Sequence, residues 1–234
     1  LHETMSIQGG PDIVNDGLIL HLDAANNRSY VSGSNIWYDL SDTKNHASLV
    51  NGPTFDSSTA KGCIYVDGVN DYIVTSKNIN ITGSASRTLM LTFNYFGGAG
   101  WGPIAEYGDG DCGGKMFGIG YFPYGNGIIS WGGCSDLSAP SSLALQQYKW
   151  NFICSRTNGT TTSLMLNKNT YSGNQNFFTQ DGPLYIGAET TAADGSNIRT
   201  RVSGRYGFII MYNRYLSDAE VLQNYNATKG RFGL

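Results

Sequence analysis

The sequence predicts an all-β fold with one short helix near the C-terminus. Short apolar or alternating runs recur along the 234 residues, and clusters of Gly, Asn, Asp, Ser and Pro separate them. Charged residues make up only 14% of the chain, whereas 31 residues are glycine, a balance that is typical of turn-rich β proteins. The apolar fraction of 40% is spread evenly, which argues against a disordered chain.

The predicted strands combine aliphatic, β-branched and aromatic residues, and turn residues follow each of them. The longest run covers residues 88–96, and Asn158-Gly159 is a strong hairpin signal between two later runs. In chain order, the predicted strands cover residues 18–23, 62–66, 72–74, 88–96, 103–107, 116–121, 127–131, 150–156, 161–167, 184–187 and 204–212.

One segment carries a complete helix signature. Ser217 and Glu220 form a capping box, in which each side chain accepts a hydrogen bond from the other residue's backbone N–H. Lys229-Gly230 predicts the end of the helix, because a cation followed by glycine is typical of a helix C-terminus. The apolar residues on one face of this helix are Val221, Leu222 and Tyr225.

No repeat, long linker or block of charge divides the chain, so we expect one domain over residues 12–234 and an extended arm over residues 1–11. The formal net charge is −3 and no Lys/Arg cluster occurs, which argues against a nucleic-acid partner. No apolar run approaches the length of a membrane span.

Motifs near both ends of the chain resemble one family. The N-terminal motifs are residues 16–26 (DGLILHLDAAN), 37–41 (WYDLS), 45–55 (NHASLVNGPTF) and 66–73 (VDGVNDYI), and the C-terminal motif is residues 207–221 (GFIIMYNRYLSDAEV). Together they resemble the laminin-G-like, concanavalin-A-like jelly-roll domains. The resemblance implies a two-sheet antiparallel sandwich with a short C-terminal helix, and it frames nearly the whole chain.

Within that superfamily, the combination of motifs resembles domains of bacteriophage virion proteins. This implies a non-enzymatic structural protein that decorates a capsid or belongs to a fibre. Its partners would be capsid or tail proteins, with surface glycans and further copies of the chain as additional candidates. The expected location is the virion, with a secreted protein as the alternative.

Catalytic carboxylates are sparse, although the superfamily includes β-glucanases. A retaining glycosidase needs two carboxylates about 5 Å apart, and the glucanase relatives carry them at alternate positions of one strand. The four glutamates, Glu3, Glu106, Glu189 and Glu220, show no such pattern. We therefore predict that the chain is not an enzyme. Glu106, with Asp109 and Asp111 nearby, is the candidate for the alternative of a glycoside hydrolase.

Two acidic turns are candidates for a calcium site. Asp109 and Asp111 stand on one Gly-rich turn, and Asp67 and Asp71 flank another, so each turn offers hard oxygen ligands. The alternatives are a solvated turn for the first pair, and carboxylates that bond local N–H groups for the second. The resemblance implies one structural calcium ion without assigning its ligands.

Aromatic residues are concentrated between residues 97 and 140, a segment unusually rich in Gly, Trp, Tyr and Cys. Sugars present flat apolar faces edged with hydroxyls, so a binder offers an exposed aromatic side chain beside polar ones. The residues predicted to bind a carbohydrate or a partner are Trp101, Tyr107, Phe122, Tyr124 and Trp131. The alternative for Trp131 is a core aromatic, as most such residues are, whereas Trp101 and Tyr124 are flanked by Gly and Pro and fit exposure and burial equally. Exposed aromatics also serve protein–protein interfaces.

The four cysteines divide into two kinds. Cys112 and Cys134 sit in similar Gly-rich settings on either side of a predicted hairpin, which makes a disulfide plausible. Cys63 and Cys154 lie inside apolar strands, where buried free thiols are expected. The sequence thus favours a virion structural protein, with a calcium-dependent carbohydrate-binding module or lectin as the second hypothesis and a hydrolase as the third.

Overall fold

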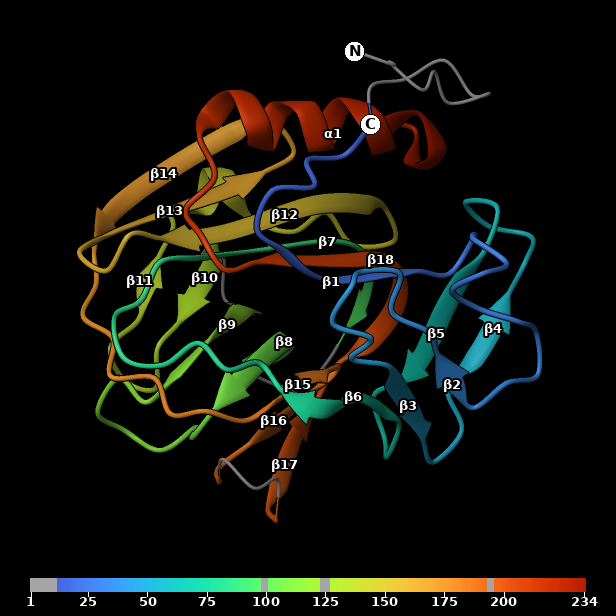
Figure 1. The fold of residues 1–234 in the computed structure, drawn as a ribbon, viewed down its shortest axis with the longest axis horizontal. Helices are drawn as coiled ribbons and strands as arrows, with labels where there is room; N and C mark the ends of the chain where they lie inside the picture. The colour runs from blue at the N-terminus through green and yellow to red at the C-terminus, as the bar shows by residue number, and fades with distance from the viewer. Residues whose placement is uncertain (1–11, 98–100, 123–126, 193–195) are drawn as a thin grey trace.

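The computed structural model describes residues 12–97, 101–122, 127–192 and 196–234. Two eight-stranded sheets lie face to face, and α1 covers the outer face of one of them (Figure 1). Every strand pairing among these residues is antiparallel. The predicted all-β sandwich with one C-terminal helix is therefore confirmed. The predicted arm over residues 1–11 lies outside the described residues.

The first sheet has β7 and β18 at its centre. Its order is β14 (Asn169–Asn174), β13 (Thr161–Leu166), β12 (Trp150–Thr157), β7 (Arg87–Gly97), β18 (Ser203–Tyr212), β5 (Cys63–Asp67) and β4 (Thr54–Asp56), and β1 (Leu18–Asp23) also pairs with β18.

The second sheet contains most of the segment between residues 97 and 140. Its order is β11 (Leu137–Ser138), β10 (Ile128–Trp131), β9 (Met116–Tyr121), β8 (Gly102–Gly108), β15 (Pro183–Ile186), β6 (Tyr72–Asn78), β3 (Ala47–Val50) and β2 (Ile36–Trp37). A short ribbon projects beside this sheet and consists of β16 (Ala188–Thr190) and β17 (Ile198–Arg201) (Figure 1).

Alternation along the central strands of the first sheet separates two cores. Leu89, Leu91 and Phe93 on β7 face the second sheet, whereas Met90 faces α1, because successive side chains point to opposite faces. The same alternation places Ile153, Ile209 and Met211 between the sheets and Phe152, Cys154, Phe208 and Ile210 under α1. Strands that are buried on both faces read as continuous apolar runs.

The helix α1 (Asp218–Phe232) begins as the capping box predicts. Ser217 Oγ accepts the Glu220 N–H at 3.3 Å, and Glu220 Oε2 accepts the Ser217 N–H at 2.8 Å. Hydrogen bonds from Arg214 and then from Ser217 lower the pKa of Glu220 to about 2.

The predicted end of α1 at Gly230 is wrong. The helix continues to Phe232, and Gly233 adopts the left-handed conformation with φ of 68°. The Phe232 ring packs against Trp150 and Phe208, with centroid separations of 4.8 and 5.8 Å. A glycine inside a helix costs only about 1 kcal/mol relative to alanine. The burial of Phe232 outweighs this cost, so the helix continues past Gly230.

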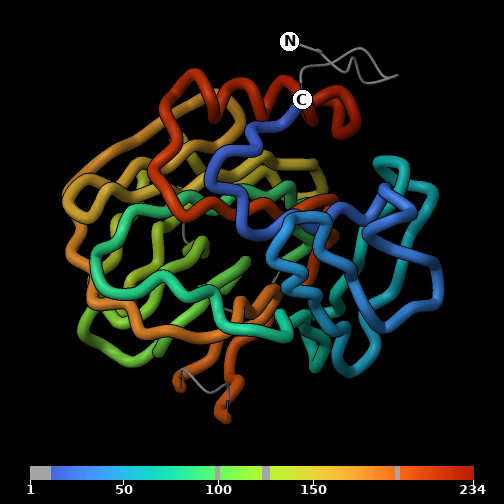
Figure 2. The backbone as a smooth tube through the Cα atoms, viewed as in Figure 1, coloured from blue at the N-terminus to red at the C-terminus, as the bar shows by residue number. Residues whose placement is uncertain are grey.

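The first described residues run along α1, where the dark blue segment of Figure 2 approaches the red helix. The Val14 N–H donates to Asn224 Oδ1 at 2.8 Å, and Gln223 Nε2 donates to the Asp12 carbonyl at 2.7 Å. These bonds fasten the two ends of the described chain to each other. No helix in the part of the chain that the structure describes has the length and hydropathy needed to cross a membrane.

The cysteines fall into the two expected kinds. A disulfide joins Cys112, in the loop after β8, to Cys134, in the loop after β10, with 4.8 Å between their Cα atoms. Cys63 and Cys154 are free and buried, and burial raises the pKa of each thiol to about 12. Neither free thiol is set up to react, because the thiolate is the nucleophilic form.

Candidate functional site

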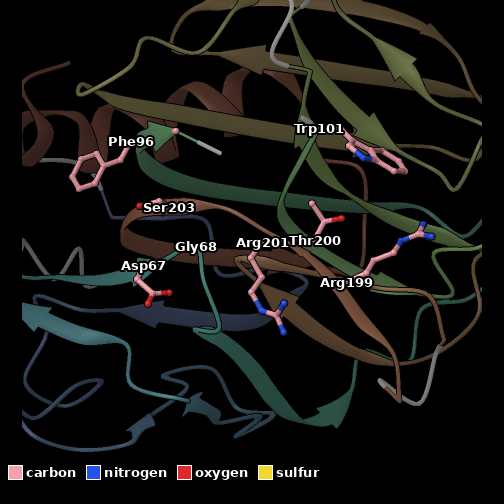
Figure 3. A pocket seen from close by; sticks show the side chains of 9 residues that line it. Asp67, Gly68, Phe96, Trp101, Arg199, Thr200, Arg201 and Ser203 are labelled. Carbon is pink, nitrogen blue, oxygen red and sulfur yellow. The ribbon is translucent and has the colours of Figure 1, made fainter. Parts of the chain in front are cut away.

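A cleft of about 460 Å³ opens where β17 of the β16–β17 ribbon lies beside the ends of β5 and β7 and the starts of β8 and β18. This volume lies within the range of sites that hold small ligands. Figure 3 shows Phe96 and Trp101 on opposite sides of the cleft, with residues of β17 and the start of β18 between them. The cleft is lined by Asp67, Gly68, Phe96, Gly97, Trp101, Arg199, Thr200, Arg201 and Ser203.

Trp101 forms one side of the cleft, immediately before β8, and is 41% exposed. Its ring stacks on the buried Trp131 of β10, with 5.3 Å between ring centroids and an angle of 32° between planes. Trp131 lies against β9, where Gly120 has no side chain and so leaves room for the indole ring. The partly exposed indole of Trp101 therefore rests on a second, buried indole.

Arg199 of β17 lies over the Trp101 ring, with its guanidinium carbon 5.6 Å from the ring centroid. Its Nε and Nη2 donate to the two carboxylate oxygens of Glu189, at 3.1 and 3.0 Å. Glu189 is fully buried, so this two-pronged ion pair fixes the guanidinium in place. Arg199 is thus a fixed part of the cleft lining, and the carboxylate of Glu189 neutralises its charge.

A second carboxylate lies beneath this pair. Glu106 of β8 is fully buried, and its Oε1 accepts the Thr190 N–H at 2.7 Å while its Oε2 has no hydrogen-bond partner among the described residues. Burial, and then the charge of Glu189, raises the pKa of Glu106 well above its ordinary value. Both effects favour the neutral form of the Glu106 carboxyl over the charged form.

The opposite side of the cleft is Phe96, near the end of β7. The Arg205 guanidinium carbon lies 4.7 Å from its ring centroid, and Arg205 is itself held by Asp56 at 3.1 Å. The rings of Tyr65 and Tyr148 also contact Phe96, each with 5.8 Å between centroids. Both aromatic sides of the cleft are thus supported by an arginine that is paired with a carboxylate.

The turn between β5 and β6 contributes the rest of the lining. Gly68 has a φ of 77°, and any side chain there would collide with the Ser203 backbone, so only glycine allows this close approach. Asp67 Oδ1 accepts the Val69 N–H at 2.8 Å and the Asn70 and Asp71 N–H groups at 3.3 Å each. This geometry is the turn-setting role that the sequence offered as one alternative for Asp67.

Tyr107 was expected in a binding surface, and this prediction is wrong. The side chain is fully buried, and its hydroxyl donates to the Ile81 carbonyl at 3.0 Å and accepts from Arg87 Nη1 at 2.9 Å. Arg87 is buried too, so Tyr107 serves to satisfy a buried guanidinium.

The other predicted aromatic residues do not share one exposed face. Trp131 is only 2% exposed, so its part in the site is to support Trp101. Phe122 is half-buried after the end of β9 and does not line the cleft. Tyr124 lies outside the described residues.

The acidic turns proposed for calcium do not supply a cage of oxygen ligands. Asp109 Oδ1 accepts the Asp111 N–H at 3.0 Å, and its Oδ2 lies 3.6 Å from Lys115 Nζ. Asp71 is buried, and its Oδ2 accepts the Asp67 N–H at 3.3 Å. No three His, Cys, Asp or Glu side chains of the described segments are placed to hold a metal together. Calcium therefore stays a prediction from the resemblance.

The sequence did not single out Phe96, Arg199, Arg201 and Ser203 as site residues, although all four line the cleft. One feature of the sequence points to two of these residues, Arg199 and Arg201. Residues 198–201 (IRTR) place two arginines at alternate positions in a chain with few charges, and alternate positions share one face of a strand. Their convergence with Trp101 depends on the fold, since about a hundred residues of chain separate them.

Comparisons with known proteins indicate the fold. No protein-family model and no curated protein matches the chain. Among solved structures, it is similar to a Trypanosoma rangeli sialidase in complex with sialic acid, with a TM-score of 0.66 and 14% identity. That match covers 98% of this chain and 36% of the sialidase chain, so this chain spans about a third of the length of the sialidases it matches.

Two further solved structures are also similar to this chain. Domain 4 of an extracellular arabinanase from Geobacillus stearothermophilus, in complex with arabinotriose, has a TM-score of 0.65 and 12% identity over 89% of this chain and 98% of that chain. The binding domain of Paraclostridial Mosquitocidal Protein 1 has a TM-score of 0.64 and 15% identity over 91% of this chain and 52% of that chain. Identities this low establish the shared β-sandwich and nothing about ligands.

Proposed function

We propose that this chain is a non-catalytic carbohydrate-binding domain that holds a saccharide in the cleft between Trp101 and Phe96. The observation that carries the proposal is Trp101. Its ring is partly exposed, is held by Trp131 behind it and by Arg199 over it, and borders a cleft of suitable size. Because the Trp101 side chain is already held in place, little side-chain entropy is lost when a ligand binds, and this favours binding of a ligand with only small apolar faces.

The chemistry of the lining matches a sugar. A pyranose offers an apolar face for the indole of Trp101, and its hydroxyls need both donors and acceptors around the rim. Arg201 supplies donors, Ser203 supplies a hydroxyl, and Asp67 supplies a carboxylate whose Oδ2 is given no donor by the described residues. The arabinotriose bound by the arabinanase domain adds support, because that domain shares this fold.

The absence of catalysis is part of the proposal. A glycosidase of the two-carboxylate kind needs a pair of acids facing its substrate, and the described lining contains one, Asp67. Glu106, the candidate for the hydrolase alternative, is fully buried and does not line the cleft. Its exclusion from the lining favours a structural role for this residue beneath Arg199.

The test is a comparison of two aromatic variants. Trp101→Ala should weaken binding of the best oligosaccharide from a glycan array by at least ~tenfold, because truncating a central aromatic contact removes much of a binding energy. Phe178→Ala is the matched control, since Phe178 is 68% exposed and lies outside the cleft. Calorimetric titration measures both affinities. Equal affinity of the Trp101→Ala variant and the wild type would show that the saccharide binds elsewhere.

A virion structural role with capsid or tail partners is the second candidate, and the motifs at both ends of the chain carry it. The Cys112–Cys134 disulfide supports an extracellular setting, either a particle surface or a secreted protein, because disulfides persist in oxidising environments. The two candidates are compatible, since a protein on a particle can hold surface glycans. Mass spectrometry of purified particles tests the second one, and absence of the chain from them would refute it.

A further inference from the structure

Arg201 differs from the other arginines around the cleft in having no carboxylate partner among the described residues. It forms no ion pair with a carboxylate of the described residues. Arg199 and Arg205, by contrast, are each paired with a carboxylate. Because Arg201 lines the cleft and no described carboxylate neutralises its charge, it is the arginine of the cleft that is left to pair with an anionic group of a ligand.

We infer that the cleft selects acidic saccharides and that Arg201 binds the carboxylate of the sugar. The inference rests on the proposed function, which concerns the same cleft. A guanidinium presents its donors in a planar fork that matches the two oxygens of a carboxylate. The ligand class is therefore an oligosaccharide that contains a uronic or sialic acid unit.

The position of Arg201 is set by the ribbon. Arg201 pairs with Ala188 in the β16–β17 ribbon, and the next residue, Val202, is buried in the core between the sheets. The Val202 N–H donates to the Gly187 carbonyl at 3.1 Å, which fixes the backbone beside Arg201. The guanidinium thus projects from an anchored strand, as a specific contact requires.

Asp67 limits how much negative charge the cleft accepts. It is the one carboxylate in the described lining, and although partial burial opposes this, backbone N–H bonds lower its pKa and keep it ionised. An ionised Asp67 repels a second anionic group and accepts hydrogen bonds from hydroxyls. We therefore expect a ligand with one carboxylate at Arg201 and neutral hydroxyls near Asp67, in preference to a densely charged polymer.

Matched pairs of sugars test this inference. The probes are sialyllactose against lactose and trigalacturonic acid against its methyl ester, with sulfated lactose as the test for a different anion. At least one acid of the two pairs should bind at least ~tenfold tighter than its neutral counterpart, because a hydrogen bond to a charged group exceeds a neutral one by about that factor. Arg201→Gln should remove the difference.

Controls separate Arg201 from general charge effects. Arg28→Gln removes the same charge from an exposed site outside the cleft and should leave the preference intact. Arg201→Gln should melt at a temperature no lower than that of the wild type, because the substitution breaks no ion pair among the described residues.

The failures of the two proposals can be told apart. If the neutral sugars bind as tightly as the acids and Arg201→Gln changes nothing, the inference is overturned while a Trp101-dependent affinity upholds carbohydrate binding. If sulfated lactose binds more tightly than either acid, the carboxylate assignment is overturned. If no sugar binds at all, the proposed function itself fails.

Discussion

Glu106 and Glu189 are two buried carboxylates that interact beneath Arg199, and only Glu189 has a cationic partner. The raised pKa of Glu106 means that the folded protein keeps a proton there over a pH range in which the unfolded chain has lost it. The stability that this group contributes is fully present below its ordinary pKa. It is lost as the pH rises through the folded-state pKa.

Glu106→Gln is predicted to reduce this pH dependence. Gln keeps an oxygen for the Thr190 N–H and carries no charge, so the variant should gain stability relative to the wild type as the pH rises above the ordinary carboxyl range. Urea unfolding of both proteins between acidic and mildly basic pH measures the effect. Because the pH responses of other groups, such as Asp136, are common to both proteins, the difference between the two curves isolates Glu106. A constant difference at every pH would contradict the raised pKa.

At the scale of elements, the β16–β17 ribbon depends on its neighbours. A two-stranded ribbon is marginally stable by itself. Glu106 holds it through the Thr190 N–H, and the Gly110 N–H donates to the Thr190 carbonyl at 3.1 Å. The loop that contains Gly110 is in turn joined to the loop after β10 by the Cys112–Cys134 disulfide. The ribbon that presents both cleft arginines is thus fastened to the second sheet.

The helix α1 allows a direct test of its cap. Ser217→Ala should lower the free energy of unfolding by about 1 kcal/mol, because the Glu220 N–H loses its acceptor at the N-terminus of α1. Ser57→Ala is the control, since Ser57 is exposed and lies in a turn far from the helix in sequence. Chemical unfolding of the three proteins measures the change. An equal effect of both substitutions would show that the cap contributes nothing specific.

At the scale of the whole molecule, apolar patterning predicts the central strands and misses the peripheral ones. The runs in β7, β12 and β18 are visible because both of their faces are buried. β14 has the sequence NTYSGN and is exposed along nearly all of its length, so only its pairing with β13 makes it a strand. The placement of β5 and β6 in different sheets follows from tertiary packing, which the turn between them does not reveal.

The cleft was predictable only in part, for a related reason. Trp101 was identified because Gly and other aromatics surround it in sequence, and the same composition wrongly pointed to Tyr107, whose neighbour Arg87 in the fold is distant in the chain. Arg199 contacts Trp101, and Arg201 lines the same cleft, because the fold places the β16–β17 ribbon beside β8. Local composition therefore identifies residue types suited to a site, and the fold decides which of them meet.

The most direct test of carbohydrate binding at this cleft uses the four tryptophans of the chain as reporters. In a nitrogen–proton NMR titration with the best oligosaccharide from the glycan array, the indole signals of Trp101 and of Trp131 behind it should shift with saturation. Trp37 is buried between the sheets and Trp150 packs against α1, so their signals should stay in place. Saturable binding that shifts the signal of Trp150 or Trp37, and leaves the signal of Trp101 unchanged, would show that the saccharide does not bind at this cleft.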